Sequence, residues 1–244
     1  MNKIITKSQK AIQKLIFPAK CMSCGKILLE KEERYGLCHS CWKKVFIIRE
    51  PVCKKCGKAI PDASEELCND CMKRKHIFKQ AKGLYSYDGA MKEIMYRFKY
   101  QNKRCYAAYF ANLASDLYAD YFRVNNINAI VPVPMYEKKK KKRGYNQAEV
   151  FAKALGEKLS IPVFSDLVVR TRNTLPQKGL SDIKRQRNLQ NAFNINEKMI
   201  QSNSVILVDD IFTTGATADI VSETLRGAGI KDVYCMFICV GKGL

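Results

Sequence analysis

The stretch from Ser204 to Gly229 constrains this chain more than any other, because it specifies a strand, a turn and a helix in succession. An apolar, β-branched run from Val205 to Val208 has the length of a buried strand. It ends at two acids, Asp209 and Asp210, and a hydroxyl-rich turn follows. Apolar residues then recur at helical spacing until two glycines end the pattern. This order predicts an α/β sheet with a ligand site at the carboxyl end of the strand.

The turn after the two acids has the chemistry of a phosphate site. It offers free backbone N–H groups at a helix N-terminus and three threonine hydroxyls, and Gly215 lets the backbone approach an anion closely. The carboxylates would repel an anion that they faced, so we expect them to accept hydrogen bonds from sugar hydroxyls. The stretch therefore predicts a cradle for ribose 5-phosphate, lined by Asp209, Asp210, Thr213, Thr214, Gly215, Ala216 and Thr217.

Residues 205–217, VILVDDIFTTGAT, closely resemble the signature of type I phosphoribosyltransferases, which bind phosphoribosyl pyrophosphate (PRPP). The resemblance implies a parallel sheet core with helices on both faces, and a Mg²⁺ ion bound together with PRPP. An ordinary Asp-capped helix is the simpler alternative, but capping needs one acid and no TTGAT run. A folded copy of the motif without catalytic activity is the second alternative.

Four Cys-x-x-Cys pairs precede this domain and predict structural zinc, because two such pairs complete a tetrahedral site of four sulfurs. A glycine follows the first and third pairs, as in a zinc knuckle. Redox activity and iron–sulfur ligation are weaker alternatives, since no thioredoxin-like context surrounds the four copies. The expected ligands are Cys21, Cys24, Cys38, Cys41, Cys53, Cys56, Cys68 and Cys71.

The pairing of the cysteines is less constrained than the metal. We favour sequential pairing, in which the first two pairs bind one ion and the last two bind another, while a crossed arrangement of alternate pairs stays open. A module of this size needs metal to fold, so one or two structural zinc ions are expected. His39, inside the second pair, is expected to be a bystander to a complete ligand set. We expect residues 1–80 to form a small N-terminal domain, a helix and a double zinc ribbon, and residues 81–244 the phosphoribosyltransferase-like domain.

The charge of the chain suggests a polyanionic partner. Lys and Arg number 43 against 23 acids, a net charge of +20, which favours nucleic acid over an anionic membrane surface. General solubility is the plain alternative. Basic residues are frequent around the cysteine pairs. This segment could therefore form a nucleic-acid-binding face or a purely structural docking module. A run of six bases could bind DNA or neutralise pyrophosphate, or form an exposed loop: Lys138, Lys139, Lys140, Lys141, Lys142 and Arg143.

A second basic stretch carries aromatic residues. The run 84–87 reads as a strand, and Asp88 is expected to cap a helix that begins near Ala90. On this helix Tyr96 and Tyr100 are interleaved with bases. Such a mixture can stack on single-stranded nucleic acid, although it is more often a solvated helix face.

Three further segments are expected to build the core sheet. Asn128 to Pro134 reads as its first strand, Val163 to Val169 as its second and Asp232 to Val240 as its last. By resemblance, the loop after the first of these holds pyrophosphate near Pro134 and Met135. The same resemblance implies that a basic loop after the second closes over the site. Its candidates for meeting pyrophosphate are Arg170, Arg172, Lys178, Arg185 and Arg187. No catalytic residue is assigned. The remaining cysteines, Cys105, Cys235 and Cys239, are expected to be inert and buried.

The order of these motifs resembles the competence protein F (ComF) family almost end to end: CxxCG, CxxCW, CxxCG, CxxC, VPVP…RGYNQAE, TLPQKGLS and VDDIFTTGAT. The resemblance implies a double zinc ribbon joined to a phosphoribosyltransferase-like domain and a role in natural transformation. Implied partners are incoming single-stranded DNA, PRPP or a related nucleotide, and other competence proteins such as a DNA-uptake helicase. The alternative is an active phosphoribosyltransferase that moves phosphoribose to an unknown nucleobase or amine.

The compartment follows from what the sequence lacks. No run approaches the ~20 apolar residues of a membrane span, and residues 1–20 lack the long apolar core of a secretory signal. Eleven cysteines in four CxxC pairs and three singles favour metal ligands over disulfides. A cytoplasmic protein with no membrane span is therefore expected.

Overall fold

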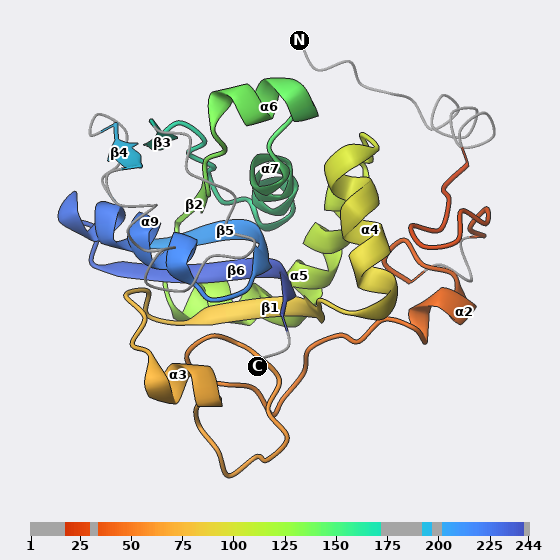
Figure 1. Cartoon of the computed structure of the whole chain (residues 1–244), viewed down its shortest axis with the longest axis horizontal. Helices are drawn as coiled ribbons and strands as arrows, with labels where there is room; N and C mark the ends of the chain where they lie inside the picture. The colour runs from red at the N-terminus through yellow and green to blue at the C-terminus, as the bar shows by residue number, and fades with distance from the viewer. Residues whose placement is uncertain (1–17, 30–33, 172–191, 197–201, 242–244) are drawn as a thin grey trace.

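The computed structural model describes residues 18–29, 34–171, 192–196 and 202–241. A four-stranded parallel sheet forms its centre, in the order β1, β6, β5, β2 (Figure 1). The strands are β1 (Ala81–Ser86), β2 (Ala129–Pro132), β5 (Ser204–Phe212) and β6 (Asp232–Val240). Because all four run in one direction, their carboxyl ends meet at a single edge of the sheet.

The two central strands are buried on both faces, which explains their continuous apolar sequences. Alternate residues of β5 join separate hydrophobic clusters: Ile206 and Val208 face one side, and Val205 and Leu207 face the other. Tyr234 and Cys235 of β6 divide in the same way. The sheet therefore has two apolar faces, and each needs its own cover.

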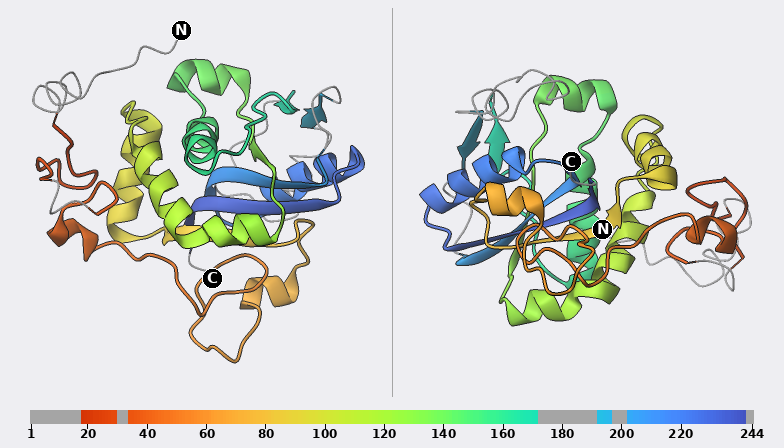
Figure 2. Two further views of the ribbon diagram at one scale, coloured as in Figure 1. Left: turned by 180° about the vertical axis from the view of Figure 1, so that it is seen from behind. Right: turned by 60° about the horizontal axis from the view of Figure 1, so that its bottom comes forward.

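Helices cover both faces, as the sequence predicted (Figure 2). One cluster contains residues of α4 (Gly89–Tyr100), α5 (Tyr106–Val124) and α7 (Gln147–Leu159), and the other contains α9 (Ala216–Gly227). The short helices are α2 (His39–Trp42), α3 (Asn69–Lys73) and α6 (Glu137–Arg143). Among the described helices, none is both long and apolar enough to cross a membrane.

Two strand predictions were wrong. Residues 163–169 do not form a strand of the central sheet: Val163 makes a single parallel bridge to Ile130, and a turn at residues 165–166 then redirects the chain. The following strand β3 (Val168–Arg170) pairs antiparallel with β4 (Phe193–Ile195) in a separate sheet. The first strand of the core is instead β1, at the edge opposite β2.

Smaller predictions, on a helix cap, a cysteine and the basic run, also differ from the structure. Asp88 is the N-cap residue of α4, but its side chain makes no capping bond and instead accepts a hydrogen bond from the Ser86 hydroxyl at 3.1 Å. Cys105 is exposed at the start of α5, whereas Cys235 and Cys239 are buried as expected. The run of six bases belongs to α6, so it does not form the exposed loop that was one alternative.

The N-terminal segment crosses the edge of the sheet. Residues 46–48 run along the free edge of β1: the Ile48 amide donates to Leu84 O and the Ser86 amide to Phe46 O, each at 2.9 Å. Cysteines before this crossing share a hydrophobic cluster with α4 and α5, and cysteines after it share the cluster of α9. The crossing covers an edge that would otherwise be open to another chain. The domain boundary at residues 80/81 stays a prediction.

Candidate functional site

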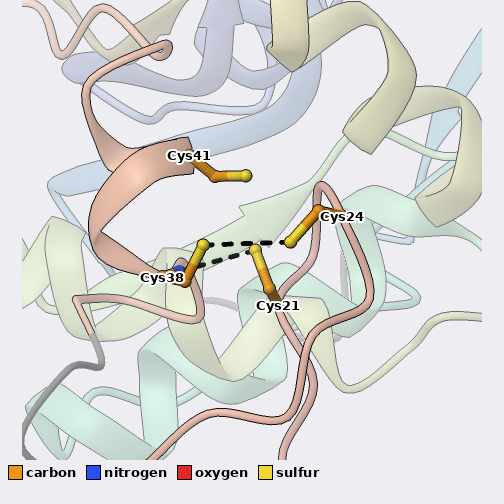
Figure 3. A group of neighbouring side chains, drawn as sticks. All are labelled: Cys21, Cys24, Cys38 and Cys41. Atoms are coloured by element: carbon orange, nitrogen blue, oxygen red, sulfur yellow. Dashed lines mark hydrogen bonds between the residues drawn. The ribbon is translucent and has the colours of Figure 1, made fainter.

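Two groups of four cysteines come together in the N-terminal segment. Within each group the sulfur atoms all lie within 4.8 Å of one another. The first group, ribbon 1, contains Cys21, Cys24, Cys38 and Cys41 (Figure 3); the second, ribbon 2, contains Cys53, Cys56, Cys68 and Cys71. This is the sequential arrangement, and seven of these eight residues are buried. Four converging sulfurs in a compact cage suit a tetrahedral Zn²⁺ ion.

The two ribbons repeat one backbone design. In each, a glycine at positive φ follows the first cysteine pair, and its amide donates to the carbonyl of the first cysteine at 2.9 Å: Gly25 to Cys21, and Gly57 to Cys53. The second pair begins at the N-cap of a short helix, α2 or α3, so one helical turn brings its two sulfurs together. The repeat explains why four CxxC pairs make two sites.

Both ribbons are docked on the core. Arg97 of α4 donates to Ser23 O at 2.8 Å, and the Tyr106 hydroxyl of α5 donates to Met22 O at 3.2 Å, which fastens ribbon 1. In ribbon 2, Lys58 is buried and pairs with Asp70, while Lys55 donates to Phe78 O. Of these two lysines, which the sequence allowed as part of a nucleic-acid face, Lys58 braces ribbon 2 internally and Lys55 docks it on the segment before β1.

The predicted ribose-phosphate cradle lies where β5 passes into α9. We call residues 213–217 the threonine loop; its Gly215 is the N-cap of α9, with φ of 76°. The first helical bond runs from the Asp219 amide to Gly215 O at 2.8 Å, so the preceding amides have no helical acceptor. A cavity of about 50 Å³ opens here, lined in part by Asp209, Thr213, Gly215, Ala216 and Thr217. Among the described residues the buried Thr214 hydroxyl has no hydrogen-bond partner.

The two acids differ in environment. Asp210 pairs with Lys99 of α4 at 3.0 Å, and both side chains are largely buried. Burial opposes the charge on Lys99, but the Asp210 and Asp209 carboxylates outweigh it, so the pKa of Lys99 is raised. Burial and the adjacent Asp210 carboxylate raise the pKa of Asp209 to about 7. Asp209 therefore changes charge near neutral pH, whereas Asp210 is held by a lysine.

This difference gives a testable pH dependence. A carboxyl with a folded pKa of about 7, above its usual 3.8, contributes stability that is fully present below pH 3.8 and is lost as the pH rises through 7. In Asp209→Asn the amide oxygen still accepts from the Asp210 amide but carries no charge. We expect the melting temperature of the variant, relative to that of the wild type, to rise by several degrees between pH 4 and pH 7 and to stay constant above pH 8. A pH-independent difference between the two melting curves would contradict this assignment.

The end of β2 adjoins these acids. The Val133 amide donates to Val208 O at 2.9 Å, immediately before Asp209 in the chain. Asn146 donates from its amide to Val133 O at 2.9 Å and caps α7 with its oxygen, which fixes the segment between β2 and α7 at both ends. Pro134 and Met135 follow, both partly buried. The predicted pyrophosphate and ribose-phosphate segments are thus adjacent.

Cations gather above this edge. Burial, together with the charges of Arg170 and Arg143, lowers the pKa of Lys139. Burial also lowers the pKa of Arg170 at the end of β3, while the Asp209 carboxylate acts in the opposite direction. Lys140 is engaged by Glu149 at 3.0 Å, whereas Lys138, Lys141 and Lys142 are exposed. Cations that repel one another are suited to receive an anion. Arg172, Lys178, Arg185 and Arg187 lie outside the described residues.

Two contributors escaped the sequence analysis. Lys99 was assigned to the solvated face of its helix, although its place four residues after the buried Met95 puts it at the border of the apolar face. His76 lies between ribbon 2 and β1, and its ring nitrogen Nδ1 lies 2.9 Å from Asp219 Oδ2. Nothing local in the sequence signals this contact, because 143 positions separate the two residues.

Comparison with known proteins supports the assignment of the N-terminal segment. Residues 12–72 match the family model "Double zinc ribbon domain". Together with the two four-cysteine sites, this supports structural zinc.

Several curated proteins are similar over most of their length. Competence protein F of Haemophilus influenzae is 31% identical over 223 residues, which cover 89% of this chain and 95% of that protein. Competence protein ComFC of Bacillus subtilis is 27% identical, with 83% of this chain and 82% of that protein covered. The DNA utilization protein YhgH of Salmonella typhimurium is 29% identical, with 91% and 98% covered.

Solved structures with similarity to this chain include two proteins named for phosphoribosyl chemistry. One is a glutamine PRPP amidotransferase from B. subtilis complexed with ADP and GMP, with a TM-score of 0.39 and 16% identity over 58% of this chain and 30% of that chain. The other is an adenine phosphoribosyltransferase, with a TM-score of 0.38 and 17% identity over 61% and 75%. This chain therefore spans less than a third of the amidotransferase.

Proposed function

Since this chain belongs to the competence protein F family, we propose that it binds single-stranded DNA during natural transformation and binds PRPP at the end of β5. Two ribbon sites, formed by the eight cysteines, hold structural zinc in this proposal. The observation that carries the DNA part is an exposed aromatic and cationic surface beside the predicted PRPP site. The PRPP part depends on the threonine loop and the acid pair.

The threonine loop has the groups that a 5-phosphate needs. Free amides at the start of α9 point into the loop, Gly215 lets the backbone come close, and the Thr214 hydroxyl lacks a partner among the described residues. Asp209 and Asp210 would accept hydrogen bonds from the ribose hydroxyls, with Lys99 orienting Asp210. Pro134 and Met135 would border the pyrophosphate, near Lys139, Arg143 and Arg170. Mg²⁺ bound with PRPP would offset the pyrophosphate charge.

The DNA surface, as we define it, consists of Tyr96 and Tyr100 on α4 together with the exposed bases of α6. The two tyrosine side chains are 53% and 60% exposed, and their ring centroids lie 5.2 Å apart. The Arg143 guanidinium lies 4.9 Å from the centroid of the Tyr100 ring, which joins the two helices. Exposed aromatic faces stack on unpaired bases, and neighbouring cations bind the phosphate backbone. Other competence proteins, a DNA-uptake helicase among them, are proposed as further partners.

Replacing both Tyr96 and Tyr100 by alanine tests this surface. Stacking contributes about 1–3 kcal/mol per base, so we expect the double variant to lose at least about tenfold in affinity for a single-stranded oligonucleotide. Phe46→Ala is the matched control, because Phe46 is an exposed aromatic residue (55%) at the edge of β1, away from α6. Fluorescence anisotropy at fixed salt measures both variants. Equal affinities of the double variant and the wild type would exclude this surface.

The exposed lysines of α6 give a second, independent prediction about DNA binding. If α6 binds phosphates, each neutralised phosphate releases counterions, and affinity falls steeply with salt. We expect Lys138, Lys141 and Lys142 replaced together by glutamine to flatten the plot of log affinity against log salt by about two to three units. Replacing Lys26, Lys43 and Lys73 of the ribbons in the same way is the charge-matched control. A slope that follows the ribbon lysines instead would move the DNA site to the ribbons.

An active phosphoribosyltransferase is the second candidate. The observation that favours it is that both acids face cations: Asp210 pairs with Lys99, and the Asp209 carboxylate acts on Arg170. A binding scaffold alone does not require this arrangement. Fold and motif support ligand binding more directly than turnover. Release of pyrophosphate from PRPP, assayed against a panel of nucleobases and amines with Mg²⁺ present, tests it. Release that needs an acceptor and disappears in Asp209→Asn would establish transfer.

A further inference from the structure

We infer that His76 and Asp219 position the threonine loop and couple its order to ribbon 2. The inference deepens the proposed function, since it concerns the loop proposed to bind the 5-phosphate. It begins with a buried contact between distant parts of the chain. His76 Nδ1 lies 2.9 Å from Asp219 Oδ2, and the side chains are only 3% and 6% exposed. The second oxygen of Asp219 accepts from the Ile77 amide at 2.9 Å.

The Asp219 carboxylate is directed away from the threonine loop, which precedes it in the chain. Asp219 lies in the first turn of α9, where an acid ordinarily interacts with the free amides of its own helix. Both of its oxygens are instead engaged by residues 76 and 77. The first-turn amides of α9 thereby stay available for a different anion.

The imidazole ring also packs directly on the loop. A Cβ atom added to Gly215 would lie 2.6 Å from Cε1 of His76, so the ring touches the backbone at the N-cap of α9. The same ring stacks on Phe78 at a centroid distance of 4.8 Å and meets the edge of Phe212 at 5.8 Å. His76 therefore fixes the last residue of β5 and the start of α9 together.

Ribbon 2 holds the other side of this segment. The Ala81 amide donates to Lys55 O at 2.8 Å, and the Gln80 side chain donates to Lys54 O at 2.8 Å. Gly57, next to the ligand Cys56, approaches Ala81 so closely that a Cβ atom would lie 2.7 Å from its carbonyl oxygen. The first knuckle of ribbon 2 is thus in contact with residues 78–81, which lead back to His76. Ribbon 1 docks on α4 and α5 and has no part in this chain of contacts.

The arrangement makes the loop depend on the state of ribbon 2. Loss of the four-cysteine site would free residues 53–57, then the segment that they support, and then His76. A ligand that orders the threonine loop would, by thermodynamic linkage, favour the form of ribbon 2 in which the four-cysteine site is intact. The pair is a positioning device, since neither His76 nor Asp219 is proposed to touch the ligand.

Hydrogen exchange in the first turn of α9 tests the inference without any ligand. In the zinc-loaded full chain we expect His76→Ala to raise exchange at residues 219–222, which carry the first hydrogen-bonded amides of α9, at least tenfold and to leave exchange in β2 unchanged. His39→Ala is the matched control, because His39 is the other histidine of the chain and is exposed. In His76→Asn the amide can still donate to Asp219, so partial recovery of protection is expected. Unchanged protection in folded His76→Ala, or in Asp219→Asn should His76→Ala not fold, overturns the inference.

The two equivalent ribbons allow a test of the coupling between ribbon 2 and the threonine loop. Cys71→Ser and Cys41→Ser alter equivalent positions of ribbon 2 and ribbon 1. We expect Cys71→Ser to accelerate exchange of the amides of residues 219–222 as His76→Ala does, and Cys41→Ser to leave these amides protected. Equal acceleration by both variants would mean general destabilisation and would overturn the coupling. If wild-type protein fails to bind PRPP while these exchange effects hold, the proposed function is wrong and the positioning role stands.

Discussion

Replacing Asp209 and Asp210 together by asparagine is expected to weaken PRPP binding by a hundredfold or more while leaving single-stranded DNA affinity unchanged. Hydrogen bonds to charged acceptors contribute roughly 1.5–3 kcal/mol each, so loss of two accounts for about two orders of magnitude or more. Asparagine retains the shape of both side chains and an oxygen for Lys99, which would otherwise be buried without a partner. Isothermal titration of the zinc-loaded protein in the presence of Mg²⁺ measures the change.

Asp120→Asn provides the control, because Asp120 is an exposed acid that pairs only weakly with Arg123 on the surface of α5. We expect its PRPP affinity to equal that of the wild type. The pH dependence supplies a second check: if ionised Asp209 accepts the ribose hydroxyls, PRPP affinity rises as pH passes through about 7. Wild-type affinity in the double asparagine variant would remove the acids from the site.

Removing zinc is expected to cause the largest loss of stability. Seven of the eight ribbon cysteines are embedded in the same hydrophobic clusters as the sheet and its helices, with Cys53 and Cys56 each 1% exposed. Structural zinc contributes on the order of 10 kcal/mol in small zinc modules. Part of this energy is expected to reach the core, because residues 46–48 between the ribbons cover the edge of β1. We expect two zinc ions per chain and a melting temperature lower by about 10 °C or more after chelation.

Atomic emission measures the stoichiometry, and differential scanning fluorimetry with and without chelator measures the stability. Calcium-selective chelation at the same concentration controls for the chelator itself. A single ion per chain, or a melting curve indifferent to zinc, would contradict the account of the ribbons.

The parts of the fold that depend on local sequence could be predicted. β5, the turn and α9 follow from an apolar run, two acids, a Gly-containing turn and a helical repeat, all within 26 residues. The four-cysteine sites follow from spacing, because a knuckle and a helical turn each bring a CxxC pair together. Helices on both faces were implied by the resemblance to type I phosphoribosyltransferases, and the burial of β5 and β6 on both faces explains why the sheet needs them.

What the sequence concealed depends on contacts between distant residues. Val163 to Val169 has the composition of a core strand, yet the turn at residues 165–166 leaves only one bridge to β2. Lys99 looked like one more exposed base until the end of β5 supplied Asp210. His76 acquires its role only because the crossing at the sheet edge returns ribbon 2 to the face that carries α9. Local sequence propensity contains no information on contacts between residues that lie far apart in the chain.

The central claim is that the β5–α9 junction binds the 5-phosphate and ribose of PRPP. A crystal structure of the zinc-loaded chain with PRPP and Mg²⁺ tests it most directly. We predict the 5-phosphate on the amides of residues 213–217, the ribose hydroxyls on Asp209 and Asp210, and the pyrophosphate beside Pro134 and Met135. Density for PRPP elsewhere, with this loop free of phosphate at saturating ligand, would contradict the claim.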